Sequence, residues 1–198
     1  ARGFLIGATS GRTTLNGEGL QHQDGHSHIL SSTIPNCKSY DPAYSYELAM
    51  IVKNGIEEMF CNLKNVFYYL TVTNENYLQP PMPNDCEEGI INGIYCLESI
   101  NDPDILLFGS GAILNESIDA KNKLNKLGIK AEVYSVTSFN LLRKDGMEND
   151  RQKQHDPSFS EMTFLRKTLG NRNQPIVAST DYMRSYPEQI RAFLENDF

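Results

Sequence analysis

The stretch from Gly17 to His28, GEGLQHQDGHSH, concentrates side chains that can move protons or bind a metal ion. It holds three of the four histidines in the chain, His22, His26 and His28, together with Glu18 and Asp24. Histidine exchanges a proton near neutral pH, and imidazole with carboxylate is a ligand set for zinc. The glycines at positions 17, 19 and 25 disfavour a regular helix or strand. The stretch is therefore predicted to be a loop, called the histidine loop below.

Two chemistries suit the histidine loop, and each has a structural alternative. His22, Asp24, His26 and His28 are spaced by two, so an extended segment would present them on one side, as a zinc-dependent hydrolase requires. The order of these residues is not the usual one of zinc hydrolases, and Gly25 interrupts the extension. Acid–base catalysis by histidine is the other chemistry. In the structural alternative, His26 hydrogen-bonds within the loop, His28 is a buried core residue and Asp24 forms an Asx turn.

Other patterns in the chain give weaker indications of chemistry. Gly109 to Leu114 lies between a predicted strand and a predicted helix, where backbone amides can hold a phosphate. The third glycine of the dinucleotide fingerprint is replaced by Leu114, which favours a simple tight turn. There is no G-x-S-x-G motif, and no cysteine neighbours a histidine.

Composition bounds the class of protein. The chain has 198 residues, 39% hydrophobic and 22% charged, which is enough for a packed core. A net charge of -7 argues against a nucleic-acid partner, and no apolar run reaches the ~18 residues of a membrane span. The four cysteines form no C-x-x-C pair, so we expect free thiols in a reducing compartment, the cytoplasm by default.

The order of predicted elements indicates an α/β fold with a mostly parallel sheet. Strands are predicted at 3–8, 66–72, 105–108, 130–136 and 176–178, and helices at 41–60, 113–127, 138–142, 159–169 and 187–194. The first helix is expected to begin at Asp41-Pro42, and Gly128 to end the second. Residues 29–40 are predicted to be extended, 143–157 to be a surface loop, and 89–100 to be a strand or a short helix. The proline-rich stretch 74–85 is predicted to be a linker, with a domain boundary near residue 85.

Long motifs resemble one known family. They are Gly11-Arg-Thr-Thr-Leu-Asn-Gly-Glu-Gly-Leu-Gln-His22, Asp24-Gly-His-Ser-His28, Ile34-Pro-Asn-Cys37, Tyr40-Asp-Pro-Ala-Tyr44, Asn74-Glu-Asn-Tyr77, Glu87-Glu-Gly-Ile90, Gly109-Ser-Gly111, Val133-Tyr-Ser-Val-Thr-Ser-Phe139 and Ala178-Ser-Thr-Asp-Tyr-Met183. Together they resemble the homodimeric bacterial pyruvate dehydrogenase decarboxylase component, one of the transketolase-like thiamine diphosphate enzymes. The resemblance runs from Gly3 to about Leu194.

The resemblance implies a fold, a reaction and partners. Residues 1–85 would be the end of a thiamine diphosphate (pyrimidine-binding) domain, and 86–198 a transketolase-like C-terminal domain truncated at its end. The family decarboxylates pyruvate on thiamine diphosphate with Mg²⁺, acetylates the lipoyl group of a dihydrolipoyl acetyltransferase core, and forms homodimers. The resemblance places His22 and Glu18 in the catalytic centre, with Glu18 near the dimer interface. It places Asp24 and His28 at the substrate funnel.

Departures from the family pattern limit what the chain can do alone. No Gly-Asp-Gly magnesium motif is present, Gln23 stands where the family has Glu, and the cofactor-activating glutamate lies upstream of residue 1. The chain is therefore expected to be a fragment that does not bind thiamine diphosphate tightly and is inactive alone, and its cofactor-binding residues are unknown. The rival hypotheses are a zinc-dependent hydrolase and a non-catalytic, dimerising fragment.

Overall fold

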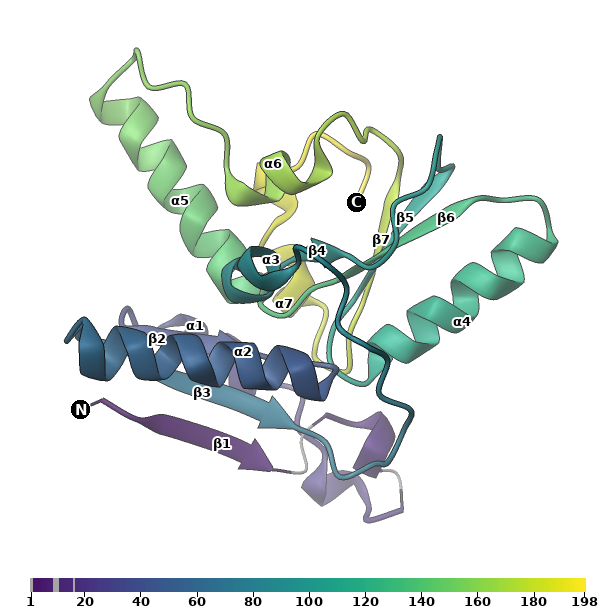
Figure 1. Cartoon of the computed structure of the whole chain (residues 1–198), viewed down its shortest axis with the longest axis horizontal. Coiled ribbons are helices and arrows are strands. Elements are labelled where there is room, and N and C mark those ends of the chain that lie inside the picture. The colour runs from purple at the N-terminus through teal and green to yellow at the C-terminus, as the bar shows by residue number, and fades with distance from the viewer. Residues whose placement is uncertain (1, 9–10, 16) are drawn as a thin grey trace.

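The computed structural model describes residues 2–8, 11–15 and 17–198 and contains two sheets (Figure 1). The first sheet has the order β1-β3-β2 and is parallel throughout. Its strands are β1 (Phe4–Ala8), β2 (Cys37–Tyr40) and β3 (Phe67–Val72). The second sheet has the order β4-β6-β5-β7, and only β4 is antiparallel. Its strands are β4 (Tyr95–Cys96), β5 (Ile105–Gly109), β6 (Ala131–Ser135) and β7 (Ile176–Ser179). The prediction of a mostly parallel α/β fold is confirmed.

Helices alternate with these strands along the chain. They are α1 (Ser27–Ser32), α2 (Ser45–Ile56), α3 (Glu87–Asn92), α4 (Ile113–Lys126), α5 (Phe139–His155), α6 (Phe164–Leu169) and α7 (Ser185–Glu188). A π-helical turn (Glu57–Cys61) extends α2, and 3-10 turns cover Thr13–Leu15, Leu20–His22 and Arg191–Phe193. No helix of the described ranges is long and apolar enough to cross a membrane.

The hydrophobic core continues from one sheet to the other. Tyr40, Ile51 and Tyr68 are fully buried between the first sheet and α2, and their cluster also includes Ile90 of α3 and Tyr95 of β4. A second cluster fills the space between the second sheet and helices α5 to α7. Because one cluster contains residues from both halves of the chain, burial of apolar surface holds the two sheets together.

One predicted non-helical segment is wrong in part and another is wrong over most of its length. Residues 29–40 were expected to be extended, which is confirmed for Cys37–Tyr40 in β2. It is wrong for residues 29–32, because α1 covers Ser27–Ser32 and ends before Pro35, which cannot continue a helix. Residues 143–157 were expected to be a surface loop, but residues 143–155 belong to α5. Its buried residues Leu142, Gly146 and Asn149 recur at helical spacing, and the other faces are charged. The pattern was missed because two of these three residues are not apolar.

The predicted start of the first long helix is also wrong. Asp41 was expected to cap it, but α2 begins at Ser45. The Asp41 backbone is used elsewhere: its amide donates to the Thr137 carbonyl at 2.8 Å, and its carbonyl accepts from the Gly111 amide at 3.1 Å. The free amides before α2 are satisfied instead by the side chain of Glu47. Helices α6 and α7 are shorter than predicted, and residues 87–96 form α3 followed by β4. Gly128 follows α4 with a φ of 80°, as predicted.

Candidate functional site

The residues that lead into the histidine loop are anchored on the segment that follows β7. Asp181 accepts hydrogen bonds from the backbone amides of Arg12 and Thr13, both at 3.1 Å, and from the Thr13 hydroxyl at 2.5 Å. Gly11 makes this approach possible, since its φ is 85° and a Cβ there would lie 2.6 Å from the Asp181 carboxylate. Arg12, which precedes the loop, is thus fixed to a residue 169 positions away in sequence.

The end of the loop is anchored as well. The Gly25 carbonyl accepts from the Met183 amide at 3.0 Å, and the Asp24 amide donates to the Gly11 carbonyl at 3.1 Å. Residues just before the histidine loop and residues near its end are therefore bonded to each other and tied to the segment after β7. Such an arrangement can hold exposed side chains in fixed positions.

His22 and Glu18 project from this anchored loop. His22 ends the 3-10 turn Leu20–His22, and both side chains are exposed. Neither side chain has a hydrogen-bond partner among the residues that the structure describes. Both are therefore accessible to a ligand, and their predicted catalytic roles stay predictions.

Asp24 starts helix α1. Its Oδ1 accepts from the amides of His26 at 3.0 Å and Ser27 at 3.1 Å, and its Oδ2 accepts from the Ser27 hydroxyl. Burial alone would raise the pKa of Asp24, but these hydrogen bonds outweigh it and the pKa is lowered. The carboxylate therefore stabilises the turn before α1, as in the Asx turn that was the structural alternative for Asp24.

His28 lies in the core and not at the surface. It is 0% exposed, and its ring stacks on Tyr186 with a centroid distance of 4.8 Å and meets the edge of Tyr182 at 4.6 Å. Its Nε2 lies 2.9 Å from the Thr71 hydroxyl. Burial lowers the pKa of His28 to about 3, and the nearby charge of Asp24 offsets this only in part. His28 is thus a neutral, buried histidine near pH 7, and a substrate-funnel role for it and Asp24 stays a prediction.

The metal hypothesis for the histidine loop receives no support. Within the described ranges, no three His, Cys, Asp or Glu side chains come together in a way that could hold a metal ion. The metal-ligand candidates are apart in the folded loop: Asp24 accepts from the amides of His26 and Ser27, His28 packs against Tyr182 and Tyr186, and His22 and His26 are exposed. For the same reason, the described residues do not fit the metal–diphosphate part of thiamine diphosphate.

A buried polar cluster near the loop was missed by the sequence analysis. Asp41, at the carboxyl end of β2, is 5% exposed and accepts from the hydroxyls of Thr71 at 2.7 Å and Ser110 at 3.1 Å. Burial raises the pKa of Asp41 to about 7; the two hydrogen bonds oppose this rise, and the charges of Asp181 and Glu47 add to it. Polar residues directly after parallel strands were the available signal, because such ends gather at one edge of a sheet.

Gly109 to Leu114 forms a tight turn. The amides of Gly111, Ile113 and Leu114 donate to carbonyls of Asp41, Ser110 and Gly111. A Cβ on Gly111 would lie 2.5 Å from the Asp41 carboxylate, so glycine is required for the close approach. Because these amides are already paired, the tight-turn interpretation is confirmed over the phosphate cradle.

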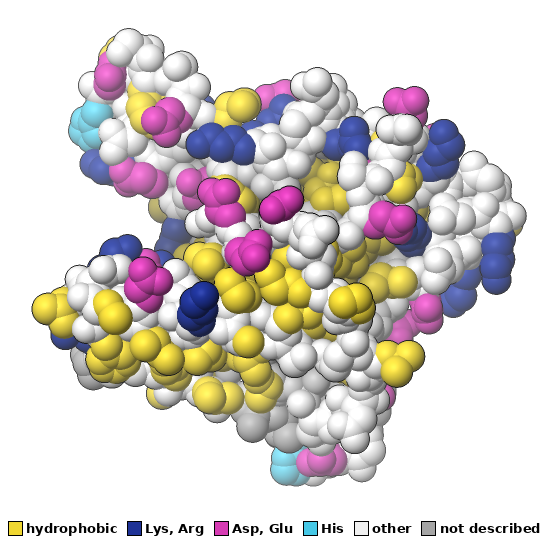
Figure 2. Space-filling view, viewed as in Figure 1, with side chains coloured by type: hydrophobic (Ala, Val, Ile, Leu, Met, Phe, Trp, Pro, Cys, Tyr) yellow, Lys and Arg dark blue, Asp and Glu magenta, His cyan; other side chains and the backbone are white. Residues whose placement is uncertain are grey.

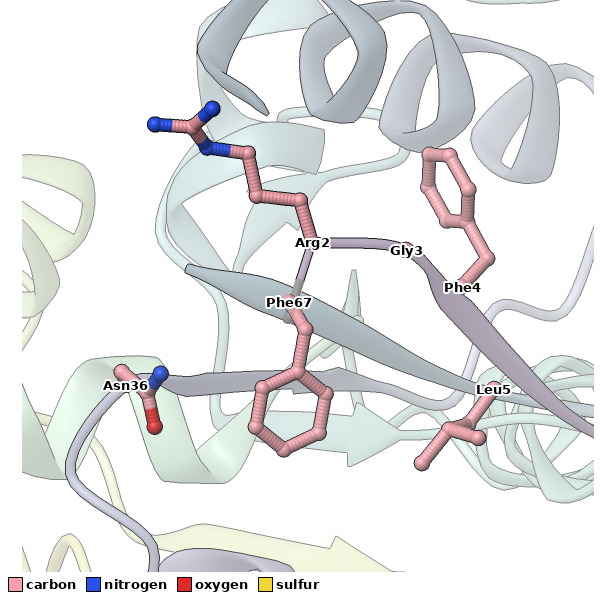
Figure 3. A pocket seen from close by; sticks show the side chains of 6 residues that line it. All are labelled: Arg2, Gly3, Phe4, Leu5, Asn36 and Phe67. Atoms are coloured by element: carbon pink, nitrogen blue, oxygen red, sulfur yellow. The ribbon is translucent and has the colours of Figure 1, made fainter. Parts of the chain in front are cut away.

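One hollow lies away from this chemistry. A pocket of about 460 Å³ is formed at the amino ends of the first sheet's strands (Figure 3). It is lined by Arg2, Gly3, Phe4, Leu5, Asn36 and Phe67. The Arg2 side chain is already bonded to the carbonyls of Leu63 and Lys64. The hollow therefore offers apolar surface and no free reactive group.

Comparison with known families identifies the class. The family model described as "Transketolase-like TK C-terminal domain" matches residues 93–196. Among solved structures, a transketolase mutant from Pichia stipitis superposes with a TM-score of 0.65 at 21% identity, covering 88% of this chain and 22% of that chain. The transketolase from Campylobacter jejuni gives a TM-score of 0.64 at 17% identity, covering 98% of this chain and 26% of that chain. The chain belongs to the transketolase-like family.

Within this family the similarity is to one kind of protein. Residues 1–80 match the family model described as "Pyruvate dehydrogenase E1 component middle domain". The chain is 52% identical to the pyruvate dehydrogenase E1 component of Pseudomonas aeruginosa, over 98% of this chain and 23% of that protein. It is 50% identical to the pyruvate dehydrogenase E1 component of Escherichia coli K12, over 100% of this chain and 22% of that protein. The chain thus spans a little over a fifth of the length of these relatives.

Proposed function

We propose that this chain forms one wall of the active centre of a pyruvate dehydrogenase (acetyl-transferring) E1 component. That enzyme would decarboxylate pyruvate on thiamine diphosphate and reductively acetylate the lipoyl group of the acetyltransferase core. The observation that carries the proposal is the 44–52% identity over at least 98% of the chain to proteins of this name. The anchored loop that presents His22 and Glu18 agrees with it.

His22 is proposed to be the acid–base group that this chain contributes. Its exposed imidazole sits on a turn whose flanks are fixed by Asp181 and Met183, so a bound 2-oxo acid would meet it in one orientation. Glu18, on the same loop, is proposed to lie at the dimer interface close to the reacting groups. When bound, thiamine diphosphate would supply the electron sink for decarboxylation. No residue of this chain is assigned to the cofactor or to Mg²⁺.

The domain assignment is part of the proposal. Residues 1–85 would be the end of the pyrimidine-binding domain and 86–198 a transketolase-like C-terminal domain. The first sheet is built from strands before residue 73 and the second from strands after residue 94, and the proline-rich stretch lies between them. This arrangement supports a boundary near residue 85.

The proposed partners are a second copy of the protein and the lipoyl domains of the acetyltransferase core. An apolar surface supports an interface of some kind: hydrophobic side chains gather over α2 and β1 (Figure 2). Leu48, Ala49, Val52 and Ile56 line a hollow on α2, and Leu5 and Ile6 of β1 are 59% and 61% exposed. Contiguous apolar patches of this kind are typical of interaction surfaces.

The test is His22→Ala in the full-length protein. Removing a positioned acid–base group should lower pyruvate turnover by about 10²–10⁴. His155→Ala is the matched control, since His155 is an exposed histidine at the end of α5 and lies outside the proposed site. Unchanged turnover in the His22 variant would rule out the assigned role.

A further inference from the structure

A hydrogen-bonded chain connects His28 with both sheets. His28 Nε2 lies 2.9 Å from Thr71 Oγ1, and Thr71 Oγ1 lies 2.7 Å from Asp41 Oδ1. The other Asp41 oxygen accepts from Ser110, whose hydroxyl also lies 3.0 Å from Thr180 Oγ1. Thr71 belongs to β3, whereas Ser110 and Thr180 follow strands of the second sheet.

The hydroxyl of Thr71 decides which nitrogen of His28 carries the hydrogen. Thr71 has one hydroxyl hydrogen, and the Asp41 carboxylate at 2.7 Å is a better acceptor than the Tyr40 carbonyl at 3.3 Å. When the Asp41 carboxyl is ionised, Thr71 therefore donates to Asp41 and accepts from His28, so the neutral ring carries its hydrogen on Nε2. The opposite tautomer would leave a buried N–H on Nδ1, which has no partner among the described residues. Buried unpaired N–H groups are rarer than unpaired acceptors.

Asp41 is in turn fixed from several sides. Its backbone is bonded to Thr137 and Gly111, and its carboxylate lies against Gly111. No ion pair among the described residues includes Asp41. The titratable groups that face it are Asp181, Glu47 and the phenols of Tyr69, Tyr77 and Tyr186. The carboxyl is thus held by hydroxyls and not by a cation.

His28 connects this series of hydrogen bonds to the histidine loop. It lies in α1, the helix that the loop leads into, and its carbonyl accepts from Asn140 of α5 at 2.8 Å. A change in the ring's position would move α1 relative to the tyrosines that surround it.

We propose that Asp41 is a positioning residue: through the Thr71 hydroxyl it holds His28 as the Nε2–H tautomer and thereby fixes α1 and the histidine loop against both sheets. The tautomer part stands on geometry alone. The effect on turnover rests on the proposed function, in which that loop carries His22.

The first measurement is ¹⁵N NMR of histidine rings in the full-length protein, with His28→Gln used to assign the signal. We expect one neutral Nε2–H form in the wild type at about pH 8 or above, where Asp41 is mostly ionised. Thr71→Val removes the hydroxyl that accepts from His28, and Asp41→Ala removes the carboxylate to which that hydroxyl donates. Each should give a mixture of tautomers. Thr71→Ser and Asp41→Asn keep a hydroxyl and an acceptor oxygen and should retain the single form. Thr137→Val is the matched control, because Thr137 is equally buried and its hydroxyl donates to the Ile90 carbonyl.

The outcomes separate this proposal from the proposed function. A single Nε2–H form in Thr71→Val or in Asp41→Ala would overturn the positioning role. If the role holds, Thr71→Val should lower pyruvate turnover roughly 10- to 100-fold while Thr71→Ser restores it. If His22→Ala abolishes turnover but Thr71→Val leaves it unchanged, the positioning role fails alone. If His22→Ala has no effect, the proposed function fails and the tautomer result stands by itself.

Discussion

At the scale of single residues, the two buried titratable groups His28 and Asp41 are shifted in opposite ways by the same cause. Burial disfavours charge, so the pKa of the base falls to about 3 and the pKa of the acid rises to about 7. Their values in an unfolded chain are about 6.5 and about 3.9. Each difference makes the stability of the fold depend on pH, with opposite sign.

We expect the two pH dependences to offset each other. The folded state holds the Asp41 proton more tightly than the unfolded state, so this contribution to stability is lost as the pH rises from about 4 to about 7. The folded state excludes a proton from His28, so stability is lost as the pH falls from about 6.5 to about 3. Between about pH 4 and 6.5, where both effects act, each changes the free energy of unfolding by at most about 1.4 kcal/mol per pH unit.

Single substitutions should reveal the contribution of each residue to the pH dependence of stability. In Asp41→Asn, the free energy of unfolding relative to wild type should rise as the pH increases from about 4 to about 7. In His28→Gln, the free energy of unfolding relative to wild type should fall as the pH increases from about 4 to about 6.5. Urea unfolding at a series of pH values measures both. Asp119→Asn, at an exposed position of α4, is the control. Variant curves parallel to that of the wild type would show that these groups are not shifted as described.

At the scale of elements, the histidine loop depends on Asp181. Asp181→Ala removes three hydrogen bonds from residues 12 and 13. We expect the loop amides to exchange with solvent at least about tenfold faster, the equivalent of about 1.4 kcal/mol in local opening. Hydrogen–deuterium exchange of peptides covering 11–28 measures this. Asp119→Ala on the exposed face of α4 should leave the exchange unchanged.

Helix α2 depends on Glu47 in a comparable way. Its carboxylate is fully buried and accepts from the Ala43 and Tyr44 amides and from the hydroxyls of Tyr95 and Ser135. Glu47→Ala removes the shared acceptor of these four donors, of which only the Tyr95 hydroxyl has a second partner, Tyr46, so the free energy of unfolding should fall by roughly 3 kcal/mol or more. Glu116→Ala, an exposed glutamate of α4, should change it by less than about 0.5 kcal/mol. Chemical unfolding of both variants tests this, and equal effects would contradict it.

At the scale of the whole molecule, the apolar surface over α2 and β1 is the main feature without a partner in the structure. We expect the 198-residue chain to self-associate through it. Ile56→Asp, at a position that is 47% exposed, should shift sedimentation towards the monomer. Leu127→Asp, at a 76% exposed position beyond α4, should not. A wild-type chain that sediments as a monomer at all concentrations would contradict the expectation.

The fold was predictable where local patterns dominate. The apolar runs at β3 and β5 and the period of α4 each reflect burial of one surface, which the sequence records directly. Prediction failed where the buried face is polar or small, as in α5 with Gly146 and Asn149. It also failed at Asp41, because Asp-Pro is a common helix start and only long-range hydrogen bonds show that this aspartate is used elsewhere.

The sequence by itself determined the α/β class, the family and the loop that presents His22, because these depend on residue types and spacings that are local. Only the tertiary structure decided that His28 is buried, and that Asp41 and Asp181 tie this region to the second sheet. These roles depend on partners up to 169 residues away, and the pKa of each group depends on a burial that no local pattern specifies.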